Sequence, residues 1–273
     1  MSPTALALAA VALWSTLALL SVRLAGVPPL LLVGTALVIG GLCGAGRWRE
    51  WRASPRLLAL GVYGLFLYHL ALFTALRLAP AVEANLINYL WPLLIVALAP
   101  LFKPGLRPNL RHGGGAALGF VGAGLLVTGG HLSAHGGHLL GYALAAAAAL
   151  IWSTYSLATS RLGGVPTGLV GLFCLLSGAL ALACHFAWEP AYSWRSADLP
   201  WLLALGLGPM GLAFYAWDAA MKRGDPRSIG ALSYLTPLAS TLLLAAGTGR
   251  PLTAVTGTAM GLIVGGAALG GLA

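Results

Sequence analysis

The sequence ANLINYLWPLL, residues 84–94, places two amides, a tyrosine, a tryptophan and a proline inside an otherwise apolar run. A similar pattern, GALSYLTPLAS, returns at residues 230–240. Tyr89 of the first stretch aligns with Tyr234 of the second, an offset of 145 positions. An internal repeat over such a distance predicts that the chain consists of two related halves.

Two further matches keep the same order along the chain. Residues 13–16, Leu-Trp-Ser-Thr, return as Ile-Trp-Ser-Thr at residues 151–154. The glycines at 119 and 124, near the end of the first half, match those at 261 and 266, near the end of the second half. The small drift in offset fits a few residues of loop length. We therefore expect a first repeat over residues 1–131 and a second over residues 138–273.

The composition places this repeat in a membrane. Hydrophobic residues make up 59% of the 273 positions and charged residues only 8%, with a mean hydropathy of +0.89. Ordinary soluble domains carry about 25% charged residues. A membrane β-barrel would need alternating in/out patterns of about ten residues, whereas this chain has long unbroken apolar runs. The composition predicts an all-α polytopic membrane protein.

Splitting the chain at its charged residues gives the number of spans. A helix needs about 20 residues to cross the hydrocarbon core. The charge-free stretches of that length are 1–22, 24–46, 57–76, 84–102, 162–188, 199–217, 228–249 and 251–273. The uncharged stretch 112–160 is long enough for two helices joined by a polar turn at residues 131–138. The sequence thus predicts ten transmembrane helices.

The basic residues predict the orientation. Eleven Lys and Arg fall in the predicted loops 47–56, 103–111, 161–165 and 222–227, and four fall on the other side. Cytoplasmic loops are enriched in Lys and Arg, so we expect both termini inside the cell. The formal charge of +9 is then a signal of topology, and a nucleic-acid partner is not expected.

Five helices per half is an odd number, so the second half enters the membrane from the opposite face. Inverted repeats of this kind are typical of secondary transporters, because each half can adopt the other's conformation during alternating access. The alternative is a duplicated structural assembly without transport.

Three tryptophans lie near the middle of their predicted spans, namely Trp14, Trp91 and Trp152. Trp usually lies at the membrane–water interface, where its N–H group finds a partner. Each of these three stands beside a polar residue at or near a repeat-matched motif. They therefore indicate a central cavity, with ordinary packing between helices as the alternative.

The repeated proline motif predicts polar groups at the same depth. Asn85, Asn88 and Tyr89 share one helical face with Pro92, and Ser233 precedes Pro237 in the matching helix. A proline cannot donate to the carbonyl four residues earlier, so each helix should kink and expose a carbonyl, that of Asn88 or Ser233. Such carbonyls suit an ammonium or hydroxyl group. A neighbouring side chain that satisfies them is the alternative.

Few groups inside the spans can carry a proton. His69 lies mid-span beside Tyr68, Glu83 opens a helix where a carboxylate is favoured, and Asp218 lies one turn before Lys222. We interpret Glu83 first as a helix-start residue and Asp218 first as half of an ion pair, with proton coupling through His69, Glu83 or Asp218 as the alternative. An intramembrane enzyme built on His69 is a further hypothesis, although no nucleophile motif accompanies it.

Two other clusters have simple structural interpretations. The histidines at 131, 135 and 138 could gather a metal, but a polar outer turn is favoured and no metal site is predicted. Gly115 and Gly119 in the fifth helix, and the glycines at 257, 261 and 265 in the tenth, are spaced for close helix packing. That packing is expected within one chain, with a dimer interface as the alternative.

Taken together, these motifs resemble the drug/metabolite transporter superfamily of the ten-helix EamA type, over the whole chain. The motifs that carry the resemblance are Trp14-Ser15, Val82-Glu83, residues 88–92, residues 211–217 and residues 233–237. The resemblance implies a bacterial inner-membrane exporter of aromatic and other neutral amino acids, with threonine and methionine among the candidates. It also implies a central cavity between helices 1, 3, 4, 6, 8 and 9. Asp218 departs from the pattern, which leads one to expect a neutral amide there.

The predicted site follows from these arguments. The substrate-binding residues are expected to be Trp14, Ser15, Tyr68, His69, Asn85, Asn88, Tyr89, Trp91, Trp152, Ser153, Tyr215, Ser233, Tyr234 and Thr236. Pro92 and Pro237 are the expected hinges. No catalytic residue or cofactor is predicted; the expected partners are a small neutral substrate and the lipid bilayer, and the chain is expected to work as a monomer. An aromatic, neutral site would also suit cationic or apolar drugs and other metabolites, which is the alternative substrate class.

Overall fold

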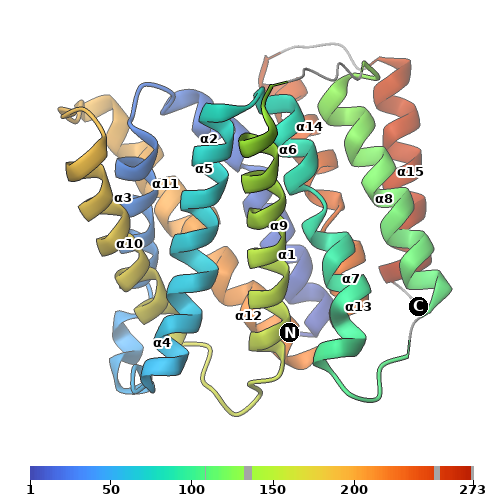
Figure 1. Cartoon of the computed structure of the whole chain (residues 1–273), viewed down its shortest axis with the longest axis horizontal. Coiled ribbons are helices and arrows are strands. Elements are labelled where there is room, and N and C mark those ends of the chain that lie inside the picture. Colours follow the sequence, from blue (N-terminus) through green and yellow to red (C-terminus); the bar gives the residue numbers. More distant parts are fainter. Residues whose placement is uncertain (108, 132–136, 249–252, 272–273) are drawn as a thin grey trace.

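The computed structural model describes residues 1–107, 109–131, 137–248 and 253–271, and these residues form helices and connecting turns without a strand (Figure 1). The helical elements, in chain order, are α1 Pro3–Ser15, α2 Leu17–Arg23, α3 Pro29–Leu42, η1 Ala45–Glu50, α4 Pro55–Val62, η2 Tyr63–Leu67, α5 Tyr68–Leu78, α6 Ala81–Asn88, α7 Trp91–Phe102, α8 Leu110–Thr128, α9 Leu139–Ser160, α10 Leu169–Trp188, η3 Ser196–Asp198, α11 Leu199–Leu207, η4 Gly208–Leu212, α12 Ala213–Arg223, α13 Pro226–Leu232, α14 Leu235–Thr248 and α15 Ala254–Gly271.

Eight helical segments among the described residues are long and apolar enough to cross a membrane. Several of them combine consecutive elements, such as α1 with α2, α6 with α7 and α13 with α14. Two shorter apolar helices, α3 and the stretch Ala254–Gly270 of α15, occupy the positions of the predicted second and tenth spans. The chain is thus a polytopic helical membrane protein, and the count of ten spans remains a prediction.

The predicted kinks appear as breaks in two helices. One helix stops at Asn88 and resumes at Trp91, and the other stops at Leu232 and resumes at Leu235. Each proline falls in the first turn of the new helix, where a missing N–H group costs nothing. The expectation of a free Ser233 carbonyl is wrong, because the Thr236 N–H donates to it over 3.0 Å. The tighter turn satisfies that acceptor locally.

Two short π-helical segments were not predicted from the sequence. They are η2 at Tyr63–Leu67 and η4 at Gly208–Leu212, and they interrupt the third and the eighth predicted helices. Their offset is 145 positions, the same as that of the proline motifs. π-Turns widen a helix locally and often mark functional positions.

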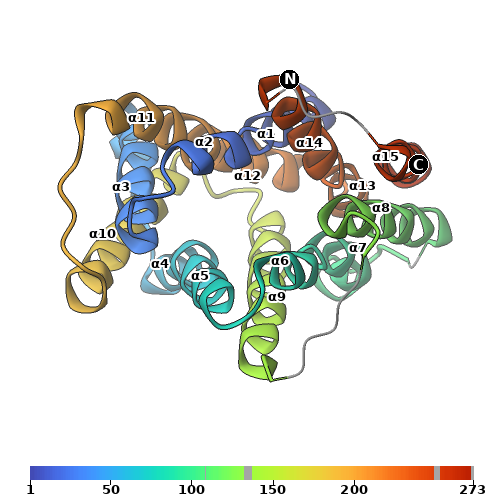
Figure 2. The ribbon, with the colours of Figure 1, turned by 90° about the horizontal axis from the view of Figure 1, so that it is seen from above.

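The helices pack in matched pairs. α8 packs along α15 and α3 along α10, and the contact of α5 with α9 has its counterpart in that of α12 with α1. Figure 2 shows α1, α11 and α14 along one edge of the molecule and α5 and α6 along the other. The first helix of each predicted repeat therefore lies against helices of the opposite repeat.

Glycines allow the closest of these contacts. A Cβ on Gly115 would lie 2.6 Å from the Gly266 carbonyl oxygen, and one on Gly122 would lie 2.8 Å from the Ala259 oxygen, so α8 and α15 meet backbone to backbone. The expected stripe at Gly257, Gly261 and Gly265 does not take part. An added Cβ at any of these three would have no neighbour within 4 Å, because they lie on another face of α15.

The connections separate into two faces. The N-terminus, the 47–56 segment and the α9–α10 connection lie at the lower edge of Figure 1, whereas the α2–α3 and α10–α11 connections lie at the upper edge. This grouping agrees with the loop assignment used to predict topology. Of the three outer-turn histidines, the one at position 135 lies outside the described residues.

Candidate binding site

Five aromatic rings from four spans meet in the middle of the bundle. The ring cluster consists of Trp14 on α1, Trp91 on α7, Trp152 on α9, and Phe214 and Trp217 on α12. Their ring centroids lie 5.1 Å apart for Trp14 and Trp217 and 6.4 Å for Trp91 and Trp152. The three mid-depth tryptophans of the predicted site thus contact one another in this cluster.

The rings of the cluster fill the centre in this conformation. The exposed fraction is 1% for Trp217 and at most 8% for the other members of the cluster. Most pairs meet edge to face, the geometry that aromatic quadrupoles favour. Trp14 and Trp91, for example, cross at 80°, and Trp91 and Trp217 at 85°. The centre of the structure is thus filled by the protein's own rings.

Two indole N–H groups have partners within the bundle. Trp14 donates to the carbonyl of Pro209 over 3.1 Å, and Trp217 donates to the Ser156 hydroxyl over 3.0 Å. Pro209 belongs to the π-helical segment η4, so the widened turn supplies the acceptor. Both bonds fix the orientation of a ring in the cluster.

Tyr68 and His69 extend the cluster along α5. Tyr68 lies 5.3 Å from Trp152, and His69 lies 6.3 Å from Phe214, between ring centroids. His69 is 7% exposed, and its Nδ1 atom lies 2.5 Å from the Leu65 carbonyl oxygen. Of the three predicted candidates for proton coupling, His69 is the one whose ring contacts the cluster.

The two helix breaks are joined by hydrogen bonds. The Tyr234 hydroxyl donates to the Tyr89 carbonyl over 3.1 Å, linking the break in one half to the break in the other. Ser15 donates to the Thr236 carbonyl over 3.3 Å and so ties α1 to the second break. Both acceptors are backbone groups at positions where the regular helical ladder is interrupted.

Two buried polar atoms near the breaks have no partner among the described residues. They are Oδ1 of Asn88 and Oγ1 of Thr236. The side-chain nitrogen of Asn88 donates to the Tyr68 hydroxyl over 3.4 Å, whereas the side-chain oxygen of the same amide is unsatisfied. An unsatisfied buried acceptor costs about 1–3 kcal/mol, so such a group is available to a ligand.

Other predicted residues lie apart from this centre. The Ser153 hydroxyl donates to the Leu150 carbonyl of the same helix, and the Ser233 hydroxyl donates to the Gly230 carbonyl. Asn85 is half-buried, one turn before Asn88. Tyr215 points away from the cluster, and its hydroxyl donates to the Gly40 carbonyl over 3.2 Å. The structure therefore assigns Tyr215 to the contact between α12 and α3.

Sequence reasoning missed Phe214 and Trp217 as members of the cluster. Trp217 directly precedes Asp218, and a charged residue in the sequence indicates the end of a span. The usable signal was the i, i+3 spacing of Phe214 and Trp217, which puts both on one face and leaves Tyr215 on another.

Both carboxylates of the prediction accept hydrogen bonds, and Asp218 is buried whereas Glu83 is half-buried. Asp218 accepts from Lys222 over 2.7 Å and from Thr167 over 2.8 Å, which confirms the predicted i, i+4 ion pair. Glu83 lies in the first turn of α6, as predicted, and accepts a hydrogen bond from Tyr142. In the described ranges, no group of three His, Cys, Asp or Glu side chains could hold a metal ion.

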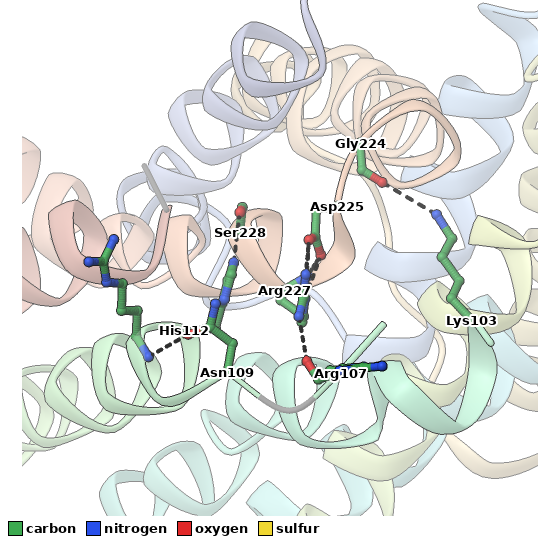
Figure 3. A network of polar contacts seen from close by, with 9 residues as sticks. Lys103, Arg107, Asn109, His112, Gly224, Asp225, Arg227 and Ser228 are labelled. Carbon is green, nitrogen blue, oxygen red and sulfur yellow. Dashed lines mark hydrogen bonds and ion pairs between the residues drawn. The ribbon is translucent and has the colours of Figure 1, made fainter. Parts of the chain in front are cut away.

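A polar network lies at one end of the bundle, between the α12–α13 turn and the segment that follows α7 (Figure 3). Arg227 donates to Asp225 over 2.6 Å and to the Arg107 carbonyl over 2.6 Å. Lys103 donates to the Gly224 carbonyl over 3.3 Å, and His112 Nε2 lies 3.2 Å from the Ser228 hydroxyl. The network links the second half to the first at this face.

Burial and neighbouring charges shift the pKa values of two groups in this network. Burial lowers the pKa of the Lys103 ammonium, and the nearby Asp225 carboxylate offsets part of that change. Burial raises the pKa of the Asp225 carboxyl, but the hydrogen bonds from Arg227 outweigh it and hold this pKa below its usual value. A salt-bridged carboxylate of this kind contributes stability that is fully present above the ordinary carboxyl pKa and is lost as the pH falls from there through the lowered value.

Comparisons with known proteins extend these observations. The profile of the EamA-like transporter family matches residues 1–128 and again residues 139–271. The aromatic amino acid exporter YddG of Ancylobacter novellus is 43% identical to this chain, over 98% of this chain and 96% of that one. The aromatic amino acid exporter YddG of Salmonella typhimurium is 28% identical over 92% and 90% of the two chains. A crystal structure that is 42% identical superposes with a TM-score of 0.94 over 98% of this chain and 94% of that one.

Membrane-spanning helices around a buried aromatic centre, with this likeness over the full length, define a polytopic membrane transporter. The chain belongs to the EamA-like transporter family.

Proposed function

We propose that this protein exports neutral, mainly aromatic amino acids across the bacterial inner membrane, with the ring cluster as the contact surface for the substrate side chain. The observation that carries the proposal is the meeting of Trp14, Trp91 and Trp152 at one buried centre. The 43% identity to an aromatic amino acid exporter over nearly the whole chain supports the substrate class.

The transport cycle rests on two inverted halves with ten spans in all. Three observations support this arrangement: the family profile matches the chain twice, the helix pairs are matched, and the π-helical segments share the offset of the proline motifs. Each half supplies rings to the cluster, so rocking of the halves opens the centre first to one side and then to the other. Because both halves lie in one chain, the monomer is the transporting unit.

The unsatisfied acceptor near the first helix break suits the substrate's ammonium group. Asn88 Oδ1 has no partner among the described residues. Tyr68, whose hydroxyl accepts from the Asn88 side-chain nitrogen, contacts Trp152. Thr236 Oγ1 on the opposite break is available to the carboxylate. Asp218, the buried acid beside the cluster, is neutralised by Lys222. A strongly anionic substrate would therefore leave its charge unpaired, at a cost of several kcal/mol.

The function is tested by efflux of labelled phenylalanine from proteoliposomes that contain the purified protein, with and without a pH gradient. Efflux that ignores the gradient defines a facilitator driven by the amino acid gradient itself. Efflux driven by the gradient defines a proton antiporter, and His69→Gln should then flatten its pH dependence. Absence of efflux from vesicles with folded protein would reject the amino acid assignment.

The substrate class is tested by a single substitution. Trp91→Ala should weaken transport of tryptophan by about two- to thirteen-fold and of threonine much less, because contacts between aromatic rings are worth about 0.5–1.5 kcal/mol beyond burial. Trp188→Ala is the matched control, because this tryptophan is 64% exposed and lies outside the cluster. Equal losses for both substrates would contradict a stacking role. Competition by a quaternary ammonium compound instead of phenylalanine would favour drug export.

Orientation has its own test. A cysteine placed at Asn109 should be protected from impermeant thiol reagents in intact cells and become labelled in inverted vesicles, since this connection is proposed to be cytoplasmic. Labelling from outside would reject the proposed topology.

A further inference from the structure

The face of the molecule that carries the polar network holds two kinds of basic residues. Those of the first kind are used inside the fold. Arg227 pairs with Asp225, and Lys103 donates to the Gly224 carbonyl (Figure 3). Lys222 pairs with Asp218. Their donors are consumed by the protein itself, so they have little capacity for an external anion.

Those of the second kind lie in the segment from η1 to the start of α4. Arg47, Arg49, Arg52 and Arg56 fall within ten residues of one another and are all exposed. In the part of the chain that the structure describes, none of their guanidinium groups takes part in an ion pair. Four exposed guanidinium groups are thus free of ion pairs within this part of the chain, and one acidic residue, Glu50, lies among them in sequence.

This segment is anchored to the bundle. The Trp51 N–H donates to the Gly168 carbonyl over 3.0 Å, and the Glu50 carboxylate is turned toward Gly168, next to the start of α10. Trp48, in contrast, is 64% exposed, and the Arg49 guanidinium lies 5.8 Å from its ring centroid. Anchoring reduces the entropy that the arginines lose on binding, and an exposed Trp beside Arg is a side-chain pair typical of the membrane–water interface.

We propose that the basic–aromatic surface formed by Arg47, Trp48, Arg49, Arg52 and Arg56 binds the phosphate headgroups of anionic phospholipids in the adjacent leaflet. Guanidinium groups pair with phosphate oxygens through two parallel hydrogen bonds, and the exposed indole lies at the depth of the headgroups. Clusters of four or more basic residues next to a membrane helix have the charge to hold such lipids. Because Trp51 ties the surface to α10, bound lipid would also fix α3 and α10 relative to the bilayer.

The test counts bound lipid, so it does not depend on transport. The purified full-length protein is titrated with phosphatidylglycerol or phosphatidylcholine at low salt, and lipid adducts are measured by native mass spectrometry. Phosphatidylglycerol should bind more tightly, and R49Q/R52Q should weaken it by roughly 25-fold, at about five-fold per arginine. Salt should reduce the difference, because exposed charges are screened within about 10 Å at 0.1 M.

The matched control is R107Q/R111Q, which removes the same charge from two exposed arginines of the same face. It should change phosphatidylglycerol binding less than three-fold. Equal losses in the two double variants, or equal binding of the two lipids by the wild type, would overturn the proposal. Displacement of the lipid by millimolar inorganic phosphate would assign the surface to free anions instead. If R49Q/R52Q unfolds, R49K/R52K decides: it keeps the charge and should keep the binding, and loss of binding would reject the proposal.

Discussion

The first helix and its counterpart in the second half carry the same Trp-Ser-Thr motif but differ in structure. The helix that contains Trp14 stops at Ser15 and resumes at Leu17, whereas α9, which contains Trp152, runs unbroken for 22 residues. Both motifs reach the same ring cluster. The difference therefore lies in what surrounds the two hydroxyl residues.

The partners of the two motifs explain the difference. Ser15 bonds to the Val11 carbonyl over 2.7 Å and also reaches the Thr236 carbonyl of the broken helix in the other half. Ser153 bonds only within its own helix. A contact across the halves pulls one motif out of regular geometry, while its twin stays helical. Repeated sequences in an alternating-access protein must adopt two conformations at once, and this pair records such a difference within one chain.

The largest effect is expected at Gly64, where η2 packs against α9. A Cβ at this position would overlap the ring of Tyr155, which is 4% exposed and has no space to move into. Gly64→Ala should destabilise the protein by about 1–3 kcal/mol, as overpacking does. Thermal unfolding in detergent should show the loss, at about 2–4 °C per kcal/mol.

The control for Gly64 comes from the other half. A Cβ on Gly208, in the matching segment η4, would lie 3.7 Å from Leu13 and meets nothing closer. Gly208→Ala should therefore cost less through steric contact than Gly64→Ala. If the two variants melt at the same temperature, the two halves do not differ in how tightly their first helices are held.

A smaller effect is expected at the paired serines. Ser15→Ala removes the bond to Thr236 and should cost about 1 kcal/mol, the usual value of a buried hydrogen bond. Ser153→Ala removes only a bond to the Leu150 carbonyl and should cost a few tenths. Melting temperatures of the two variants provide the comparison. A greater loss of stability for Ser153→Ala than for Ser15→Ala would contradict the interpretation that the bond from Ser15 to the other half is the stronger one.

The smallest effect is expected at Thr154, which follows Ser153 in α9. Its hydroxyl lies 2.8 Å from that of Tyr63, whereas Thr16 bonds only to the Leu13 carbonyl. Thr154→Val and Tyr63→Phe should each cost about 0.5 kcal/mol and should not add when combined, because both remove one bond. Full additivity in the double variant would mean that this hydrogen bond contributes nothing.

The sequence predicted the parts of the site that depend on depth and on proline. Trp14, Trp91 and Trp152 could be placed because residue counting along a span gives depth to within a turn. The breaks before Pro92 and Pro237 could be placed because proline removes a backbone donor at a known position. Both rules act within one helix and need no knowledge of its neighbours.

Features set by contacts between helices could not be predicted in this way. The break at Thr16 has neither glycine nor proline, and an identical tripeptide stays helical in α9, so contacts with other helices, such as the bond from Ser15 to Thr236, distinguish the two. Trp217 was missed because Asp218 marks a helix end in sequence, yet Lys222 and Thr167 allow that carboxylate to be buried. The ion pair moves the apparent edge of the span.

The glycine contact between α8 and α15 has a consequence for how the protein is made. α8 ends at Thr128, whereas α15 begins only at Ala254 and is therefore synthesised much later. Until then Gly115 and Gly122 present bare backbone without the α15 backbone that packs against them, a surface shaped for one helix of small residues. During translation, this face of α8 therefore has no packing partner until α15 has been synthesised. Separately expressed halves should therefore find each other in the membrane along this contact.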